Sequence, residues 1–166
     1  MGKILVTYYS AEGHTKRIAE IIAKTLNADT FEIIPKEPYT KDDLNWMNPE
    51  SRSYRQHEAE ISQDVELETT EVPNWADYDA VLVGYPIWWG YAAYPVPSFM
   101  AGRDFKGKAV FPFCTSHSSG IGDSDIKLKF IIMPPLDKVD WHDAERFFQD
   151  AREEEIIKWA KSLKIS

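Results

Sequence analysis

Cysteine is the scarcest of the reactive residues in this chain of 166 residues. Cys114 is the only one, so neither an intramolecular disulfide nor a cysteine-based metal cluster can form. The four histidines, His14, His57, His117 and His142, are scattered along the chain and show no ligand spacing such as His-x-x-x-His. We therefore expect no bound metal, and we expect Cys114 to be an inert core thiol.

Long apolar runs and an excess of basic charge are also missing. No apolar segment approaches membrane-spanning length, and the N-terminus lacks the basic and apolar regions of a signal peptide. Lys and Arg number 19 against 27 Asp and Glu, which gives a formal net charge of −8. An acidic chain repels nucleic acid and anionic membrane surfaces. These features predict a soluble cytoplasmic protein with no nucleic-acid or membrane partner, and docking on basic proteins is a secondary explanation of the acidity.

Several short apolar segments alternate with helix-periodic ones. Each is a continuous apolar run, as expected for a strand covered on both faces of a sheet. The predicted strands are residues 3–8, 30–34, 80–85, 109–114 and 138–142. The predicted helices are residues 14–27, 50–61 and 151–163. This alternation predicts an α/β fold with a doubly wound parallel sheet in one domain, residues 1–166, and residues 35–76 form a long crossover connection.

The first predicted strand ends in a loop of small and hydroxyl-bearing residues that leads directly into a helix. Ser10, Thr15 and the backbone amides of residues 12–15 then face a common point. Unpaired amides at a helix start, reinforced by the helix dipole, favour a phosphate or carboxylate. The glycine spacing of a dinucleotide site and the lysine-containing loop of a nucleotide hydrolase are both absent. The anion is therefore expected to come from a ligand other than NAD or ATP.

Two more loops follow predicted strands and are expected at the same edge of the sheet. Residues 86–91 contain the adjacent tryptophans Trp88 and Trp89 before a glycine. We expect one indole to cap the core and the other to face a flat ring by offset stacking or edge contact. Residues 115–122 are rich in Ser and Gly and allow close approach of the backbone. Together the three loops predict a pocket for a phosphorylated aromatic ligand.

These segments resemble the flavodoxin-like FMN-binding proteins, above all the short group with a Gly-Tyr-Pro-Ile-Trp-Trp-Gly loop, here residues 84–90. The resemblance also covers the first loop and residues 112–116, and it extends over nearly the whole chain. It implies a three-layer α/β/α fold with a five-stranded sheet in the order 2-1-3-4-5, and it implies FMN as the cofactor. The implied phosphate site includes His14, where many relatives carry asparagine. The predicted cofactor-binding residues are Ser10, Glu12, Gly13, His14, Thr15, Pro86, Ile87, Trp88, Trp89, Gly90, Thr115, Ser116, His117, Ser118, Gly120 and Gly122.

The leading functional hypothesis is a flavodoxin that transfers electrons between redox partner proteins, with no catalytic residue of its own. The alternative is an NAD(P)H-dependent FMN oxidoreductase that acts on quinones or similar acceptors, with His117 or Tyr91 orienting the substrate. The oligomeric state is left open between monomer and homodimer. Two further hypotheses are a hydrolase with Ser10 as nucleophile and His14 as base, which lacks an orienting acid, and a binding module without flavin.

Two smaller features in the sequence are open to more than one interpretation. The long crossover contains three large side chains, Trp46, Met47 and Tyr54. They either pack the crossover against the rest of the protein or cover the face of the flavin that lies away from the tryptophan loop. Asp123 and Asp125 are interpreted as caps of a following helix.

Overall fold

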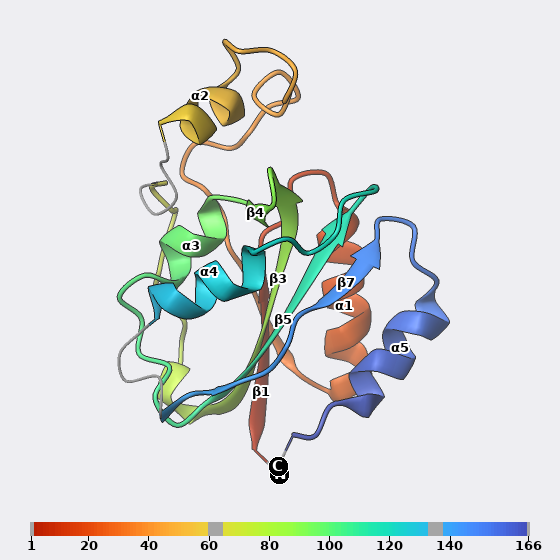
Figure 1. The fold of residues 1–166 in the computed structure, drawn as a ribbon. Helices are drawn as coiled ribbons and strands as arrows, with labels where there is room; N and C mark the ends of the chain where they lie inside the picture. Colours follow the sequence, from red (N-terminus) through yellow and green to blue (C-terminus); the bar gives the residue numbers. More distant parts are fainter. Residues whose placement is uncertain (1, 60–64, 133–137, 166) are drawn as a thin grey trace.

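The computed structural model describes residues 2–59, 65–132 and 138–165. A parallel sheet forms the middle of three layers (Figure 1). Its strands lie side by side in the order β2 (Asp29–Glu32), β1 (Lys3–Tyr8), β3 (Tyr78–Trp88), β5 (Ala109–Ser116) and β6 (Asp140–Trp141). Two further strands leave this path: β4 (Tyr91–Ala92) pairs antiparallel with β3, and β7 (Glu145–Phe148) pairs parallel with β5. The doubly wound parallel architecture is confirmed, with a similar strand order and extra strands.

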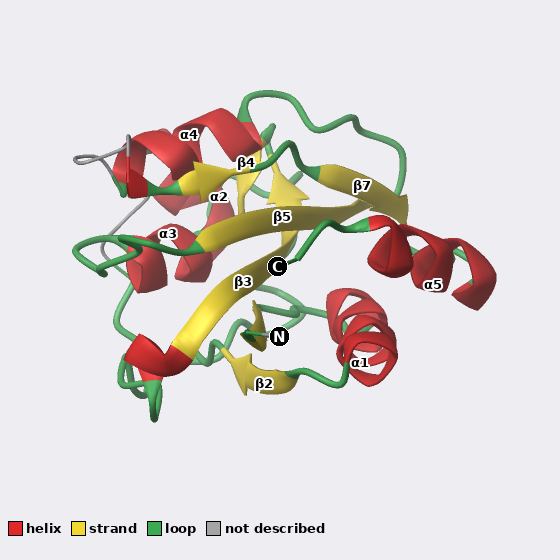
Figure 2. Ribbon diagram, turned by 90° about the horizontal axis from the view of Figure 1, so that it is seen from below, coloured by secondary structure: helices red, strands yellow, loops and turns green. Residues whose placement is uncertain are grey.

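Helices cover both faces of this sheet. The helices are α1 (His14–Leu26), α2 (Arg52–Glu58), α3 (Pro95–Met100), α4 (Ser124–Ile131) and α5 (Glu153–Ser162). Figure 2 shows α1 and α5 together on one face and α3 and α4 on the other. The predicted helices at 14–27 and 151–163 are confirmed. The predicted helix at 50–61 is shorter, because α2 ends at Glu58, and residues 60–61 lie outside the described ranges.

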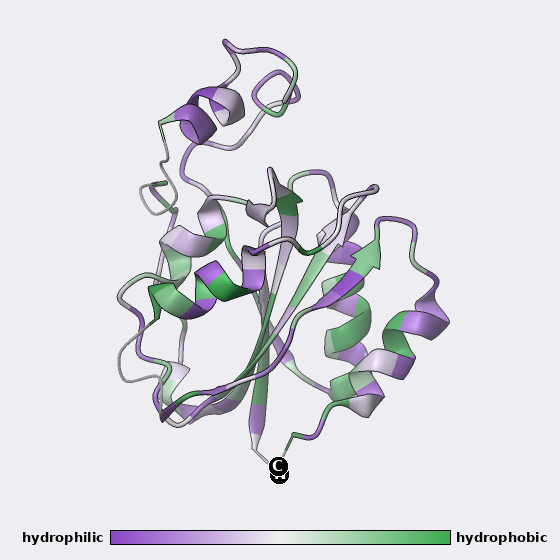
Figure 3. Ribbon diagram, viewed as in Figure 1, coloured by the Kyte–Doolittle hydropathy of each residue, from purple (hydrophilic) through white to green (hydrophobic). Residues whose placement is uncertain are grey.

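The hydrophobic core has two halves, one on each side of the sheet. Leu5 and Val81 belong to the half beneath α3 and α4, whereas their strand neighbours Val6 and Leu82 belong to the half beneath α1 and α5. Successive side chains of a strand point to opposite faces, so a strand covered on both sides needs apolar residues at every position. Figure 3 shows hydrophobic colours along much of the central strands and hydrophilic colours over most of α2.

The edge strand after α4 differs from its prediction. The predicted strand at 138–142 is ordered as a strand only over β6, and the pairing with β5 resumes in β7. Ala109 pairs with Asp140 but Phe113 pairs with Glu145, so the edge strand gains one residue between the two segments. An extra residue of this kind interrupts the ladder and bends the strand. Strand β7 was not predicted. It pairs with the last four residues of β5, at the carboxyl edge of the sheet.

The long crossover after β2 rises above the carboxyl edge of the sheet and carries α2 (Figure 1). Its base is closed by an antiparallel bridge between Pro35 and Leu67, flanked by backbone hydrogen bonds that join Lys36 to Glu66 and Glu68 to Ile34. Ser51 caps α2 by accepting the amide of Tyr54 at 3.3 Å. The two ends of the crossover are therefore joined to each other at its base, and α2 lies above the carboxyl edge of the sheet (Figure 1).

Candidate functional site

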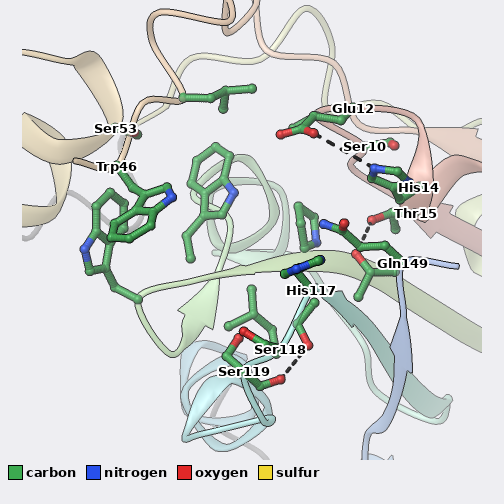
Figure 4. Close-up of a pocket in the computed structure, with 18 residues that line it drawn as sticks. Ser10, Glu12, His14, Thr15, Trp46, Ser53, His117, Ser118, Ser119 and Gln149 are labelled. Atoms are coloured by element: carbon green, nitrogen blue, oxygen red, sulfur yellow. Dashed lines mark hydrogen bonds and ion pairs between the residues drawn. The ribbon is translucent and has the colours of Figure 1, made fainter. Parts of the chain in front are cut away.

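The carboxyl ends of β1, β3 and β5 and the loops that follow them meet around one pocket of about 480 Å³ (Figure 4). The predicted loops begin later than expected, because residues 86–88 belong to β3 and residues 115–116 to β5. The carboxyl edge is where doubly wound sheets bind their ligands. The predicted residues that line the pocket are Ser10, Glu12, His14, Thr15, Pro86, Ile87, Trp88, Trp89, Thr115, Ser116, His117 and Ser118. The predicted glycines Gly13, Gly90, Gly120 and Gly122 are not among its lining residues. The structure thus brings the three loops together, and the role of each residue toward a cofactor stays a prediction.

The first loop holds free hydrogen-bond donors at the start of α1. The Ser10 hydroxyl oxygen accepts the amides of Gly13 at 3.0 Å and of Lys16 at 3.1 Å, which leaves its own O–H as a donor. The prediction of free amides across residues 12–15 is wrong at Gly13, because Ser10 occupies that amide. No hydrogen bond is made by the amides of Glu12, His14 and Thr15 within the part of the chain that the structure describes. These amides and the helix dipole suit an anionic group.

A buried hydrogen bond joins the first loop to the third. The hydroxyls of Thr15 and Thr115 lie 2.9 Å apart, and both side chains are almost fully buried. Either hydroxyl is able to donate, so one of the pair keeps a hydrogen atom for another acceptor. The start of α1 and the end of β5 are thereby fixed relative to each other at the pocket.

The third loop is held in place by Arg146 on β7. The Arg146 Nε donates to the Ser116 hydroxyl oxygen and to the Ser119 carbonyl, each at 3.0 Å. The Ser116 hydroxyl in turn donates to the Ser119 carbonyl. At its far end, a Cβ atom on Gly122 would lie 3.0 Å from the Gly90 carbonyl oxygen, so the second and third loops touch through their backbones. Only a residue without a side chain fits there comfortably.

The two tryptophans of the second loop occupy different surroundings. Trp88 meets Tyr9, Tyr39 and Tyr94 in edge-to-face contacts with ring centroids 5.1–5.9 Å apart. Trp89 stacks on His57 of α2 at 4.6 Å with an interplanar angle of 6°. Trp88 therefore packs against the core, and Trp89 ties the loop to the crossover. Both also line the pocket.

A two-residue hairpin turn presents Trp89. Trp88 on β3 pairs with Tyr91 on β4, and the two residues between them, Trp89 and Gly90, have φ values of 50° and 78°. Two consecutive positive φ values in a two-residue hairpin are typical of a type I′ turn, in which Asn-Gly is the preferred sequence. A tryptophan at the first turn position is unusual and aims its ring at α2 and the pocket.

The pocket also has walls outside the predicted set of cofactor-binding residues, although one interpretation of the sequence has Trp46 cover the flavin. The additional lining residues are Ala11, Leu44, Trp46, Ser53, Ser119 and Gln149. Leu44, Trp46 and Ser53 come from the crossover, where only Trp46 carried a signal, as an aromatic side chain in a polar segment. Trp46 is 64% exposed, so it does not pack the crossover down. In Figure 4 Trp46 and Ser53 lie across the pocket from Ser10, His14 and Thr15.

The electrostatics of the pocket are nearly neutral. No Lys or Arg lines it within the described ranges, and Glu12 lies 3.9 Å from the His14 imidazole as an ion pair when that ring is protonated. Ser10 and His14 make no hydrogen bond with each other among the described residues, so nothing here supports the Ser10 hydrolase. Cys114 lies beneath the pocket fully buried, and burial raises the pKa of its thiol to about 12.

Comparisons with known proteins identify the family. The family model for flavodoxin matches residues 3–163. The chain therefore belongs to the flavodoxin family. Two solved structures, from Bacteroides eggerthii and Bacteroides uniformis and both assigned as flavoproteins, are 34% and 33% identical to it, each with a TM-score of 0.85. The alignments cover 100% of both chains for the first and 97% of this chain and 99% of the other for the second.

A third solved structure shares the fold at lower identity. It is a flavoprotein from Lactobacillus acidophilus in complex with FMN, 20% identical, with a TM-score of 0.67 over 96% of this chain and 99% of the other. The family match and this complex support FMN as the cofactor, as the sequence predicts, and the flavodoxin-like fold class is confirmed. None of the helices in the described ranges has the length and apolar character needed to cross a membrane.

Proposed function

We propose that this protein is an FMN-binding flavodoxin of the short group with the Gly84–Gly90 loop, and that it transfers electrons between redox partner proteins in the cytoplasm. One observation carries the proposal. Three loops with different chemistry, one with free amides, one aromatic and one rich in Ser and Gly, line a single pocket at the carboxyl edge of the sheet. Doubly wound sheets bind their ligands at the carboxyl ends of their strands, which supports this pocket as the cofactor site.

The donor set fits a terminal monophosphate joined to a flat ring. The free amides of Glu12, His14 and Thr15, with the O–H of Ser10, are neutral donors suited to the phosphate. Residues 86–90 and 115–122 would hold the isoalloxazine from two sides. FMN supplies the redox chemistry when bound, and the protein sets its potential and its access to partners.

The described part of the pocket has no lysine or arginine to stabilise the negative charge that the isoalloxazine ring gains on reduction. Its walls near Trp88 and Trp89 are aromatic. A low-dielectric enclosure without a compensating charge disfavours added negative charge. We therefore expect a low reduction potential for the bound cofactor, which suits an electron donor.

Cofactor binding tests the proposal directly. Titrating the apoprotein with FMN should quench FMN fluorescence, and inorganic phosphate should compete. Thr15→Val removes a hydroxyl at the start of α1 and its hydrogen bond to Thr115. It should weaken FMN binding by about ten- to a hundredfold, since a hydrogen bond to a charged group is worth about 1.5–3 kcal/mol. Thr25→Val, at the far end of α1, is the matched control. A folded apoprotein that binds no FMN would refute the proposal.

The oxidoreductase remains a second candidate because the crossover adds its own wall to the pocket. Leu44, Trp46 and Ser53 enclose space beyond the three loops, which suits a small acceptor held beside the flavin. An anaerobic reductive titration of the FMN-loaded protein separates the two functions by the number of electrons taken up in each step. Rapid oxidation of NADPH with a quinone acceptor would favour the enzyme, and its absence with one-electron uptake would favour the carrier.

A further inference from the structure

A second cavity of about 430 Å³ lies between α2, β4, α3 and α4, outside the loops that form the first pocket. Its apolar wall comes from Ala92, Pro97, Leu128 and Ile131. The stacked pair of Trp89 and His57 lies between the two cavities, since Trp89 lines the first and His57 the second. A flavodoxin that only carries electrons has no need of this space, and its size suits a small organic molecule.

The polar groups of this cavity occupy two different depths. Lys127 is exposed, and its ammonium lies 3.7 Å from the ring centroid of Tyr91, with no carboxylate paired to it within the described ranges. Tyr94 is only 3% exposed, and its buried hydroxyl oxygen has no hydrogen-bond partner in residues 2–59, 65–132 and 138–165. The Lys127 ammonium is therefore at the exposed side of the cavity, and the Tyr94 phenol is at its buried side.

The Tyr94 hydroxyl is a donor without a hydrogen-bond partner among the described residues. Leaving a buried hydroxyl unsatisfied costs about 1–3 kcal/mol, so most such groups in folded proteins have a partner. Burial also raises the pKa of Tyr94, which keeps the phenol protonated and able to donate. A ligand oxygen brought against this wall would accept that hydrogen bond.

We propose that this cavity binds a small aromatic carboxylate with an oxygen substituent on its ring. The ring packs against the apolar wall and Tyr91, the carboxylate pairs with Lys127, and the ring oxygen accepts from Tyr94. Glu58 also lines the cavity and is exposed, so it opposes an anion only weakly at the rim. The inference does not depend on the cofactor of the first pocket.

Three related probes test each contact by calorimetry on the full-length protein, with and without added FMN. 4-Hydroxybenzoate should bind best, 4-hydroxybenzamide should lose the ion pair, and benzoate should lose the Tyr94 hydrogen bond. Lys127→Met should remove the preference for the acid over the amide, about fivefold, and Tyr94→Phe should remove the preference for 4-hydroxybenzoate over benzoate, also about fivefold. Lys129→Met makes the same charge change on α4 outside the cavity and should leave both preferences intact.

Two further readouts keep the proposal falsifiable. Amide shifts on adding 4-hydroxybenzoate should cluster at residues 91–94 and 124–131, whereas shifts at residues 10–15 would mean that the probe binds in the first pocket. Tyr94→Phe should not lower the melting temperature of the ligand-free protein, because the described part of the chain offers its hydroxyl no hydrogen-bond partner to lose. The proposal would be overturned if 4-hydroxybenzoate showed no saturable binding. It would also be overturned if Lys127→Met and Tyr94→Phe lowered the affinity for all three probes equally, or if Tyr94→Phe lowered the melting temperature.

Discussion

At the scale of single residues, Trp89 shows a local conflict at the pocket. A residue with a side chain pays about 1–2 kcal/mol in the left-handed region that its φ of 50° occupies. Its stacking on His57 and its edge-to-face contact with Tyr54 each offset about 0.5–1.5 kcal/mol of this strain. The ring contacts and the strain are of similar size, so the indole contributes little net stability through them. Strain kept at a site in this way points to a role in binding.

Replacing Trp89 by asparagine should therefore separate folding from cofactor binding. Asparagine suits the first position of a type I′ turn, so we expect Trp89→Asn to change the free energy of unfolding by less than about 1 kcal/mol. The affinity for FMN should fall about tenfold, because a ring contact of the pocket is lost. Urea unfolding of the apoprotein and FMN titration measure the two effects. His57→Ala, which removes the stacking partner and keeps the indole, is the control, and unchanged FMN affinity in Trp89→Asn would contradict this role.

Glu12 is the acidic residue of the proposed phosphate site. Its side chain is 63% exposed and lies 3.9 Å from the His14 imidazole. Glu12→Gln removes a negative charge beside the phosphate, and solvent screening limits the effect. We expect FMN to bind about two- to threefold more tightly at low salt, and we expect the gain to shrink as salt is added. Glu154→Gln on α5 is the charge-matched control. Weaker FMN binding in Glu12→Gln would show that the carboxylate supports the site through His14.

At the scale of elements, the sequence predicts what repeats over many residues and misses what depends on distant contacts. The apolar face that includes Ile18 and Ile22 predicts α1, and both are fully buried. The hairpin strand β4 has only two residues and a Trp-Gly turn, and α3 is a six-residue helix that contains Pro95 and Pro97. Short elements of this kind are fixed by tertiary packing, because their own sequence preferences are too weak.

Strand β3 offers a sharp test of packing between elements. A Cβ atom on Gly84 would lie 2.3 Å from the Cζ of Phe113 on the neighbouring strand β5, and Phe113 is fully buried. Gly84→Ala should cost about 2–3 kcal/mol of unfolding free energy, as overpacking a dense core does. Combining it with Phe113→Leu should give less destabilisation than the sum of the two single changes. Additive effects in urea unfolding would show that the ring does not meet the new methyl group.

At the scale of the whole molecule, topology explains why most of the pocket could be predicted. Parallel strands end at one edge, so loops after β1, β3 and β5 converge even though more than 100 residues separate Ser10 from Thr115. The walls from Leu44, Ser53 and Gln149 could not be predicted in this way. Their positions depend on where the crossover folds back and on the turn after β7, and neither follows from the strand pattern.

Buried phenols distributed through the fold give the molecule a common response to alkaline pH. Burial, together with Glu32 beside Tyr8 and Asp29 beside Tyr78, raises the pKa of each phenol to about 12, whereas the unfolded value is near 10. The folded state therefore holds protons that the unfolded state releases between these pH values. Stability is fully present below about pH 10 and falls by up to about 1.4 kcal/mol per pH unit for each phenol as the pH rises toward 12. Tyr78→Phe keeps the ring and should reduce this slope in urea unfolding at pH 9–11.5, whereas an unchanged slope would show that Tyr78 ionises equally in both states.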